Sequence, residues 1–242
     1  MVSLLSTVKL RGAAILHAYV SSAVIALLLA WAPLSVVVAQ GAVTGQLSIL
    51  ERPGARTTDL ADGVVWLETR GAPAPPATPR TQIVMQSREY VPRVRIVALG
   101  SSVAFPNHDP FRHNVFSKSG PGEFDLGLYG RGESKEARVE RAGVYPVFCN
   151  IHSKMLAFVV AVPTSYVAQP NPDGRFSIAG VPPGTYTLHA WHDRGGIVTQ
   201  ELKVEADGRS GVMVQLDARG YRFVQHKNKF GQEYTNAGRD RY

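Results

Sequence analysis

Residues 143–155 of this 242-residue chain read GVYPVFCNIHSKM. The first half is an apolar run that predicts a β-strand ending at Cys149, and a short polar loop follows it. The loop carries an imidazole at His152 and a thioether at Met155, and a second apolar run begins directly after it. A thiolate, an imidazole and a thioether, all metal-binding groups, are thus crowded into one loop between two predicted strands.

This loop supplies three of the four ligands of a His₂Cys site with a weak axial Met, the set that is typical of blue copper. Thiolate and thioether sulfur suit Cu(I), while imidazole also suits Cu(II). The missing imidazole is expected from His113, which opens the apolar run HNVFS thirty-six positions before Cys149. His108 is the alternative, but it lies in a polar stretch with loop composition. The predicted metal ligands are His113, Cys149, His152 and Met155.

Several short runs share a pattern with a known family. They are FPNHD (105–109), HNVFS (113–117), GVY (143–145) and CNIHSKM (149–155). Together they resemble the plastocyanin and amicyanin type of cupredoxin over about residues 83–163, and the C-x2-H-x2-M loop is the short, amicyanin-like form.

The resemblance implies a Greek-key β-sandwich with one type 1 copper ion at one end. It places His113 on a neighbouring strand and His152 near the surface as the electron port. It also implies that Asn114 steadies the loop beside Cys149, a role that outer residues of metal sites commonly have.

Plainer interpretations exist for both sulfur residues. Cys149 could be an inert buried thiol, and Met155 could simply fill a gap in the core. The combined spacing of the four residues favours the metal site instead. Cys149 is the only cysteine, so it cannot form an internal disulfide, and metal ligation would protect a lone thiol in an oxidising compartment.

The N-terminus predicts export. Lys9 and Arg11 precede a long apolar run over 13–38, and small residues at 37–39 offer a cleavage site. We therefore interpret 1–39 as a signal peptide and expect a periplasmic or secreted protein with no stable membrane insertion after cleavage. An uncleaved membrane anchor is the alternative, since the run is longer than a usual signal core.

Beyond residue 39 the apolar residues alternate with a period near two, and Gly and Pro interrupt them often. The fold class is therefore expected to be all-β, with a Greek-key cupredoxin sandwich and a second, immunoglobulin-like sandwich. Eleven short strands are predicted, more than one sandwich needs. Their ranges are 43–50, 64–68, 94–99, 103–105, 114–117, 144–149, 157–162, 176–178, 185–191, 198–204 and 212–216.

The second sandwich resembles the carboxypeptidase regulatory-like domain, through the run GVPPGTYTLHAW (180–191) and the strands beyond it. The family's opening pieces, GAVTG (41–45) and GVVWL (63–67), lie before the copper domain in this chain. We therefore predict a discontinuous sandwich made of 40–72 and 164–220, into which the cupredoxin domain 83–163 is inserted. The alternative is that the first piece is an N-terminal extension of the cupredoxin.

Two segments connect or follow these domains. Residues 73–82 contain four prolines, at 73, 75, 76 and 79, and predict a stiff, extended linker. The last segment, 221–242, is a basic tail that could dock on a partner or remain solvated.

Charge and motifs limit the function. The formal charge of +7 becomes +5 once residues 1–39 are removed, but basic and aromatic residues are not interleaved, which argues against nucleic acid as a partner. The remaining histidines form no His-x-His pair for further coppers, so we expect no enzyme. His189 and His192 could form a surface metal site, but solvent-facing side chains at a strand end are the plainer interpretation.

The expected function is single-electron transfer through one type 1 copper. The redox partner would be a protein, such as a c-type cytochrome or a periplasmic oxidoreductase. A copper chaperone or buffer is the alternative, although the chain lacks the Met-rich runs that copper handling favours. A binding module dominated by the second sandwich is a third possibility.

Overall fold

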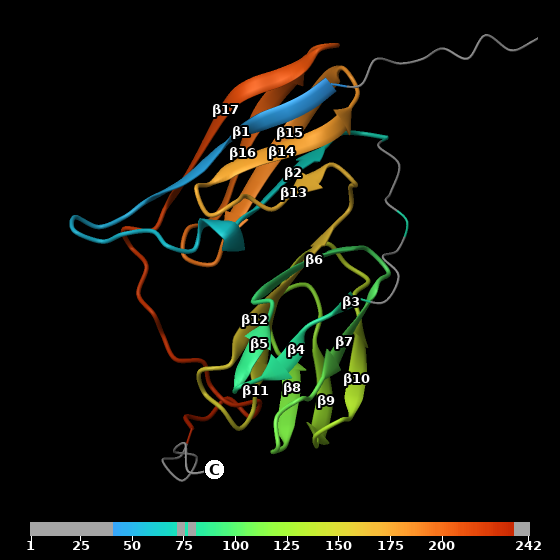
Figure 1. The fold of residues 1–242 in the computed structure, drawn as a ribbon, viewed down its shortest axis with the longest axis vertical. Helices are drawn as coiled ribbons and strands as arrows, with labels where there is room; N and C mark the ends of the chain where they lie inside the picture. Colours follow the sequence, from blue (N-terminus) through green and yellow to red (C-terminus); the bar gives the residue numbers. More distant parts are fainter. Residues whose placement is uncertain (1–40, 72–75, 77–80, 235–242) are drawn as a thin grey trace, which may run out of the picture. The chain divides into compact units, whose positions relative to one another are not determined.

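The computed structural model describes residues 41–71, 76 and 81–234 (Figure 1). Within these ranges the chain is all-β, with seventeen strands, one 3-10 turn η2 at Leu60–Asp62 and no α-helix. No helix in the described part is long and apolar enough to cross a membrane. The predicted signal peptide 1–39 and most of the linker 73–82 lie outside the described residues.

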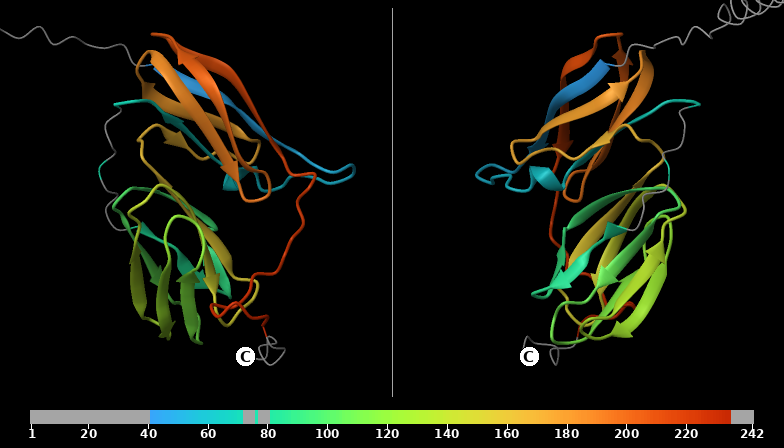
Figure 2. Two further views of the ribbon diagram at one scale, coloured as in Figure 1. Left: turned by 180° about the vertical axis from the view of Figure 1, so that it is seen from behind. Right: turned by 45° about the vertical axis from the view of Figure 1, so that its right-hand side comes forward.

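One group of strands forms a sandwich over residues 81–162. Its larger sheet has the order β6-β12-β11-β8-β9 and its smaller sheet the order β10-β7-β3, with a hairpin of β4 and β5 beside them (Figures 1 and 2). The strands are β3 Thr81–Gln82, β4 Val84–Gln86, β5 Glu89–Val91, β6 Val94–Ala98, β7 Ser102–Pro106, β8 His113–Ser117, β9 Phe124–Tyr129, β10 Ser134–Arg138, β11 Gly143–Cys149 and β12 Leu156–Val162.

Strand β11 shows how the sequence pattern orients the predicted ligand. Tyr145, Val147 and Cys149 alternate with more exposed neighbours, and all three are buried. Successive side chains of a strand point to opposite faces, so the side chain of Cys149 shares the inner face with Tyr145 and Val147. The thiol is therefore directed into the sandwich at the point where the strand ends.

The other group of strands forms a second sandwich with sheets β14-β1-β17 and β13-β2-β15-β16. Strand β1 is antiparallel to β14 and parallel to β17, while β2 is antiparallel to β15. Strands that precede the sandwich of residues 81–162 in sequence thus pair with strands that follow it. The strands are β1 Gly41–Leu50, β2 Val64–Glu68, β13 Val167–Ala168, β14 Arg175–Val181, β15 Gly184–His192, β16 Gly196–Val204 and β17 Gly208–Asp217.

Close packing of two strands explains why residue 45, in the run GAVTG at 41–45, is a glycine. The pairing of β1 with β17 shifts register between Val43 and Gly45, and a Cβ at Gly45 would lie 2.1 Å from the carbonyl oxygen of Val212. No side chain fits at that distance. Only glycine permits the two backbones to approach so closely.

Each sandwich has its own apolar core, and a third cluster joins residues of both. In that cluster the Phe158 and Trp191 rings meet edge to face, with centroids 5.1 Å apart. Arg93 adds hydrogen bonds to Asp62, at 2.8 Å, and to Asp193, at 2.5 Å. The two sandwiches therefore share apolar and charged contacts.

All eleven predicted strands are present, with ends that differ by up to four residues. Six strands were not predicted: β3, β4, β5, β9, β10 and β13. In β10 only Ala137 is buried, and β9 contains a glycine at 127 with positive φ. Both strands lie at a sheet edge, where one neighbouring strand is enough to hold polar residues in an extended conformation.

Candidate metal centre

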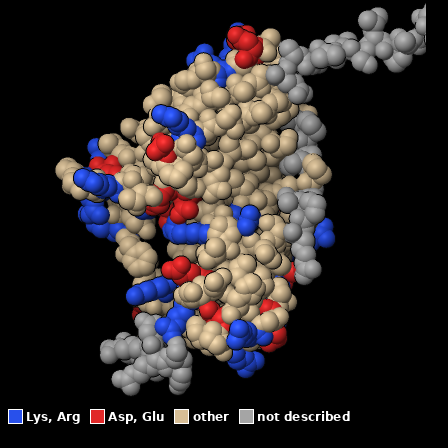
Figure 3. All heavy atoms as spheres, viewed as in Figure 1, with Lys and Arg blue, Asp and Glu red and all other residues tan. Residues whose placement is uncertain are grey.

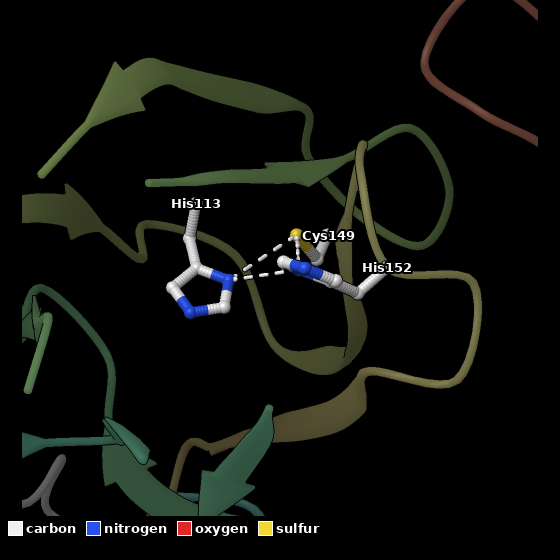
Figure 4. Close-up of side chains that lie close together, drawn as sticks. All are labelled: His113, Cys149 and His152. Atoms are coloured by element: carbon white, nitrogen blue, oxygen red, sulfur yellow. Dashed lines mark hydrogen bonds between the residues drawn. The ribbon is translucent and has the colours of Figure 1, made fainter. Parts of the chain in front are cut away.

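Three predicted ligands meet at one end of the first sandwich, as Figure 4 shows. His113 begins β8, Cys149 ends the adjacent antiparallel strand β11, and His152 lies in the loop that follows. The Cys149 sulfur lies 3.6 Å from His113 Nδ1 and 3.5 Å from His152 Nδ1, and the two nitrogens are 3.1 Å apart. Strand pairing thus brings residues thirty-six positions apart into one cluster.

The donor separations fit a single metal ion. Three atoms at these distances can surround one ion at roughly 2.0–2.3 Å from each, the usual length of bonds from imidazole nitrogen and thiolate sulfur to a metal of this size. The cluster also mixes soft sulfur with borderline nitrogen, the combination that copper takes in trigonal His₂Cys sites. Geometry and donor chemistry therefore agree.

Met155 lies at the base of the same loop. Its backbone N–H donates to the carbonyl of His152 at 3.1 Å, which closes the loop before β12 begins. The side chain is 1% exposed and belongs to the same buried cluster as Cys149. The side chain contributes to the core, and its role as the axial ligand stays a prediction.

The surroundings of Cys149 shift the pKa of its thiol. Burial raises its pKa, although the backbone N–H groups of Ile151, Asn114 and His152 are directed at the sulfur and lower it. A thiolate in this place therefore requires additional positive charge. A bound metal ion would supply that charge and displace the proton.

Asp109 is a functional residue that the sequence prediction left out. Its carboxylate accepts hydrogen bonds from His113 Nε2 at 2.9 Å and from the backbone N–H groups of Ser87, at 2.6 Å, and Arg88, at 2.9 Å. These hydrogen bonds lower the pKa of Asp109 even though burial opposes them. A carboxylate facing Nε2 keeps the proton there and leaves Nδ1 free for a metal.

The turn between β4 and β5 is held by this carboxylate. Ser87 and Arg88 both have positive φ, at 57° and 62°, which residues other than glycine adopt rarely. Their two N–H groups point to Asp109, so one acidic side chain both stabilises the turn and orients the histidine. Burial lowers the pKa of His113, and Asp109 opposes that effect.

Phe111 shields the imidazole pair. Its ring centroid lies 5.2 Å from that of His113 and 5.4 Å from that of His152, and the Arg88 guanidinium lies over the Phe111 ring, 5.1 Å from its centroid. His113 is fully buried and His152 is half-buried. Of the two imidazoles, only that of His152 approaches the surface.

The structure decides between His113 and His108 as the candidate ligand from this part of the chain. His108 is exposed and lies outside the cluster of His113, Cys149 and His152. Asn114 contributes through its backbone, since its carbonyl accepts the N–H of Asn150 at 3.0 Å. Its side chain donates to Asp125 at 2.8 Å, so the contact to the loop comes from the main chain.

A second group of possible metal ligands lies in the other sandwich, formed by Asp59, His192 and Asp193. Arg194 donates to Asp59 at 2.5 and 2.9 Å, and Arg93 donates to Asp193. Both carboxylates are thus already neutralised by arginine, and His192 is fully buried. This group forms an ion-pair network, and His192 is not the solvent-facing residue that the sequence predicted. His189 stacks on Trp66 with centroids 4.9 Å apart.

The tail also reaches the candidate centre, which the sequence analysis did not predict. Its described part, 221–234, contacts the ligand loop: Tyr234 Oη donates to the carbonyl of Cys149, and Lys229 N–H donates to Asn150 Oδ1. Burial and the nearby Cys149 raise the pKa of Tyr234, which keeps the hydroxyl a donor. The tail has no apolar periodicity that could have indicated this contact.

Comparisons with known proteins match different parts of the chain. The model of polysaccharide lyase family 4, domain II, matches residues 161–211. This match does not support the resemblance of the second sandwich to a carboxypeptidase regulatory-like domain. A rhamnogalacturonate lyase of Dickeya dadantii (strain 3937) is 42% identical over 57 residues, which are 22% of this chain. The match covers only 10% of that enzyme's length.

Solved structures that are similar to this chain include cupredoxins. A novel purple cupredoxin from Nitrosopumilus maritimus has a TM-score of 0.31 and 23% identity, over 34% of this chain and 99% of that one. A mutant of amicyanin in its Cu(I) form has a TM-score of 0.33 and 19% identity, over 34% and 82%. A reduced mutant of amicyanin has a TM-score of 0.33 and 18% identity, over 40% and 98%.

Proposed function

We propose that this chain is an exported carrier of single electrons that binds one type 1 copper ion through His113, Cys149, His152 and Met155. The observation that carries the proposal is the convergence of two Nδ1 atoms and one thiol sulfur within 3.6 Å of one another. These three donors, with a buried thioether at the base of the loop, form the set that blue copper uses.

Each part of the site has a role in such a carrier. Copper would supply the one-electron change between Cu(I) and Cu(II). His113 is held in one tautomer by Asp109, and Cys149 is fixed by the pairing of β11 with β8. Ligands that are already in place need little rearrangement, which suits a rapid electron transfer. Half-buried His152 offers the route to a partner.

We propose that the chain is not an enzyme. Four protein ligands leave no open position for a substrate, whereas catalytic metal sites keep one. Phe111 also covers both imidazole rings. The match to a rhamnogalacturonate lyase covers 10% of that enzyme, and lyase activity is not proposed.

The location and partner follow from the predicted export signal. A periplasmic or secreted carrier would serve a c-type cytochrome or another oxidoreductase in the same compartment. Basic and acidic side chains are interspersed over the face that Figure 3 shows, although the chain is basic overall, at +7. Such a surface favours docking to a protein over binding to nucleic acid.

The test is a copper titration of the mature chain, followed by visible spectroscopy. The expected result is one copper per chain and an intense absorption from the Cys149 thiolate, which Cys149→Ser abolishes. His113→Ala should lose the absorption, while the matched control His108→Ala keeps it. A colourless Cu(II) complex of the wild type would overturn the proposal.

Electron self-exchange measured by stopped flow separates the carrier from the copper chaperone or buffer. A carrier should exchange electrons rapidly and keep its copper. Slow exchange together with ready transfer of Cu(I) to a chelator would instead support copper handling.

A further inference from the structure

The end of the described chain makes direct contact with the backbone of the predicted cysteine ligand. The Tyr234 hydroxyl donates to the Cys149 carbonyl at 2.5 Å and lies 3.1 Å from His226 Nδ1. The His226 ring in turn packs against Phe148, with centroids 4.4 Å apart and planes at 34°. Residues 226–234, called the C-terminal clasp below, therefore cover the last two residues of β11.

A second set of contacts ties the clasp to both ligand-bearing strands. Lys229 N–H donates to Asn150 Oδ1 at 2.8 Å, and its ammonium group pairs with Asp125 at 2.7 Å. Asp125 also accepts a hydrogen bond from Asn114 at 2.8 Å. Asn114 follows His113 and Asn150 follows Cys149, so Lys229 connects to the neighbours of two predicted ligands.

The clasp has an ordered turn of its own. Asn228 Oδ1 accepts the N–H groups of Phe230 and Gln232, each at 3.0 Å. Gly231 has a φ of 77° and donates its N–H to the Asn228 carbonyl at 2.9 Å. Glycine adopts this left-handed conformation without strain. This turn presents Lys229 and Tyr234 to the loop in a defined arrangement.

We infer that the C-terminal clasp is part of the metal centre and that Tyr234 and Lys229 are positioning residues for the Cys149 loop, an inference that rests on the proposed copper site. Hydrogen bonding and exclusion of water around a cysteine sulfur tune the potential of a copper site. The clasp, a segment distant in sequence, hydrogen-bonds the Cys149 carbonyl and Asn150 and packs against Phe148, so it fixes the backbone that carries the sulfur and covers the end of β11.

The direction of the effect follows from charge. The oxidised site carries one more positive charge than the reduced site. Removal of water disfavours the more charged form, whereas the charge of Lys229 is offset by Asp125, with which it pairs. The clasp should therefore raise the reduction potential, and its loss should lower it.

The experiment compares the mature full chain with a truncation after Gly220 and with Tyr234→Phe, which removes only the hydroxyl. Both variants should show a lower reduction potential and a shifted thiolate absorption, with the larger shift in the truncation. In the copper-free proteins, amides of residues 149–155 should exchange with solvent several-fold faster than in the wild type.

Two controls isolate the clasp. Truncation after Tyr234 leaves the clasp intact and should retain the wild-type potential. Tyr186→Phe removes a similar hydrogen bond, from Tyr186 Oη to the Pro182 carbonyl at 2.8 Å, in the other sandwich. It should lower stability without moving the potential.

The outcomes distinguish this inference from the proposed function. Suppose that the wild type has thiolate absorption, but that the truncation and Tyr234→Phe both keep the wild-type potential and amide exchange. The clasp then has no role, and the copper proposal stands. If the wild type has no thiolate absorption, the copper proposal fails, and unchanged amide exchange would overturn the clasp as well. A truncation that fails to fold leaves Tyr234→Phe as the deciding variant.

Discussion

Asp109 and His113 share a hydrogen bond of 2.9 Å between a carboxylate oxygen and Nε2, on the side of the ring that faces away from Cys149. This contact determines which nitrogen of His113 is free to bind a metal. It also connects the metal centre to the β4–β5 turn, whose two N–H groups donate to the same carboxylate.

Replacing this carboxylate should weaken metal binding. Asp109→Asn replaces one acceptor oxygen by an NH₂ group, which cannot accept hydrogen bonds from His113 Nε2 or from the two N–H groups of the β4–β5 turn. The tautomer of His113 and the conformation of the turn are then both less well fixed. Loss of such an outer hydrogen bond commonly costs 10–100-fold in metal affinity, and we expect a loss of about that size. Competitive copper titration measures it. Exposed Asp207→Asn is the control, and an unchanged affinity in Asp109→Asn would show that the contact does not orient the histidine.

The thioether of Met155 should tune the site without being essential for it. Met155→Leu should keep the thiolate absorption and raise the reduction potential, because loss of a weak axial donor disfavours Cu(II). Spectroscopy and voltammetry of the copper-loaded variant test this. Met213→Leu, on an exposed position of β17, is the matched control. Disappearance of the absorption would mean that Met155 is a principal ligand.

The ion-pair network around Asp193 predicts a pH-dependent stability. Burial opposes ionisation of Asp193, but hydrogen bonds from His192 and Arg93 lower its pKa to about 2, from 3.8. Its contribution, about 2 kcal/mol, is therefore present above pH 3.8 and lost as the pH falls towards 2. The pKa of His192 is raised above 6.5 despite burial, so its contribution is present below pH 6.5 and lost above the raised value.

The network should therefore stabilise the protein most between about pH 4 and pH 6.5. Asp193→Asn should lower the free energy of unfolding in that window and flatten its dependence on pH. Urea unfolding at several pH values measures both quantities, with exposed Asp173→Asn as the control. A variant that keeps the wild-type pH dependence would show that the network contributes little.

Excision tests the predicted insertion of one sandwich into the other. Residues 76–163 should fold cooperatively and bind copper, because they contain all four predicted ligands and one complete apolar core. Residues 41–72 joined by a short Gly-Ser bridge to 164–220 should fold as a colourless sandwich, since β1 and β2 pair with β14, β15 and β17.

Two features of the structure refine this expectation. Both pieces expose the cluster around Phe158 and Trp191, so each should be less stable than the whole chain. The copper fragment also lacks the C-terminal clasp and should have the potential of the truncated chain. Thermal unfolding monitored by circular dichroism decides the outcome. A copper fragment without a cooperative transition would favour the N-terminal extension instead.

The sequence by itself determined the local features of this protein. The apolar run in residues 143–149 was enough to predict a strand that ends at Cys149. The burial pattern of that strand in the structure then shows that the Cys149 side chain points inward. The spacing of His152 and Met155 predicted one loop with three candidate donors. The composition around each residue also favoured His113 over His108, and the structure places His113 in the cluster.

Only the tertiary structure decided the contacts between segments that are far apart in sequence. The role of Asp109 depends on a turn at 87–88 that approaches it from another strand, and the clasp depends on a return of the chain from β17 to the Cys149 loop. These contacts are made by single polar side chains, which leave no periodic pattern in the sequence. Hydrophobic periodicity reports which face of an element is buried, but it carries no information about which distant element provides a hydrogen bond.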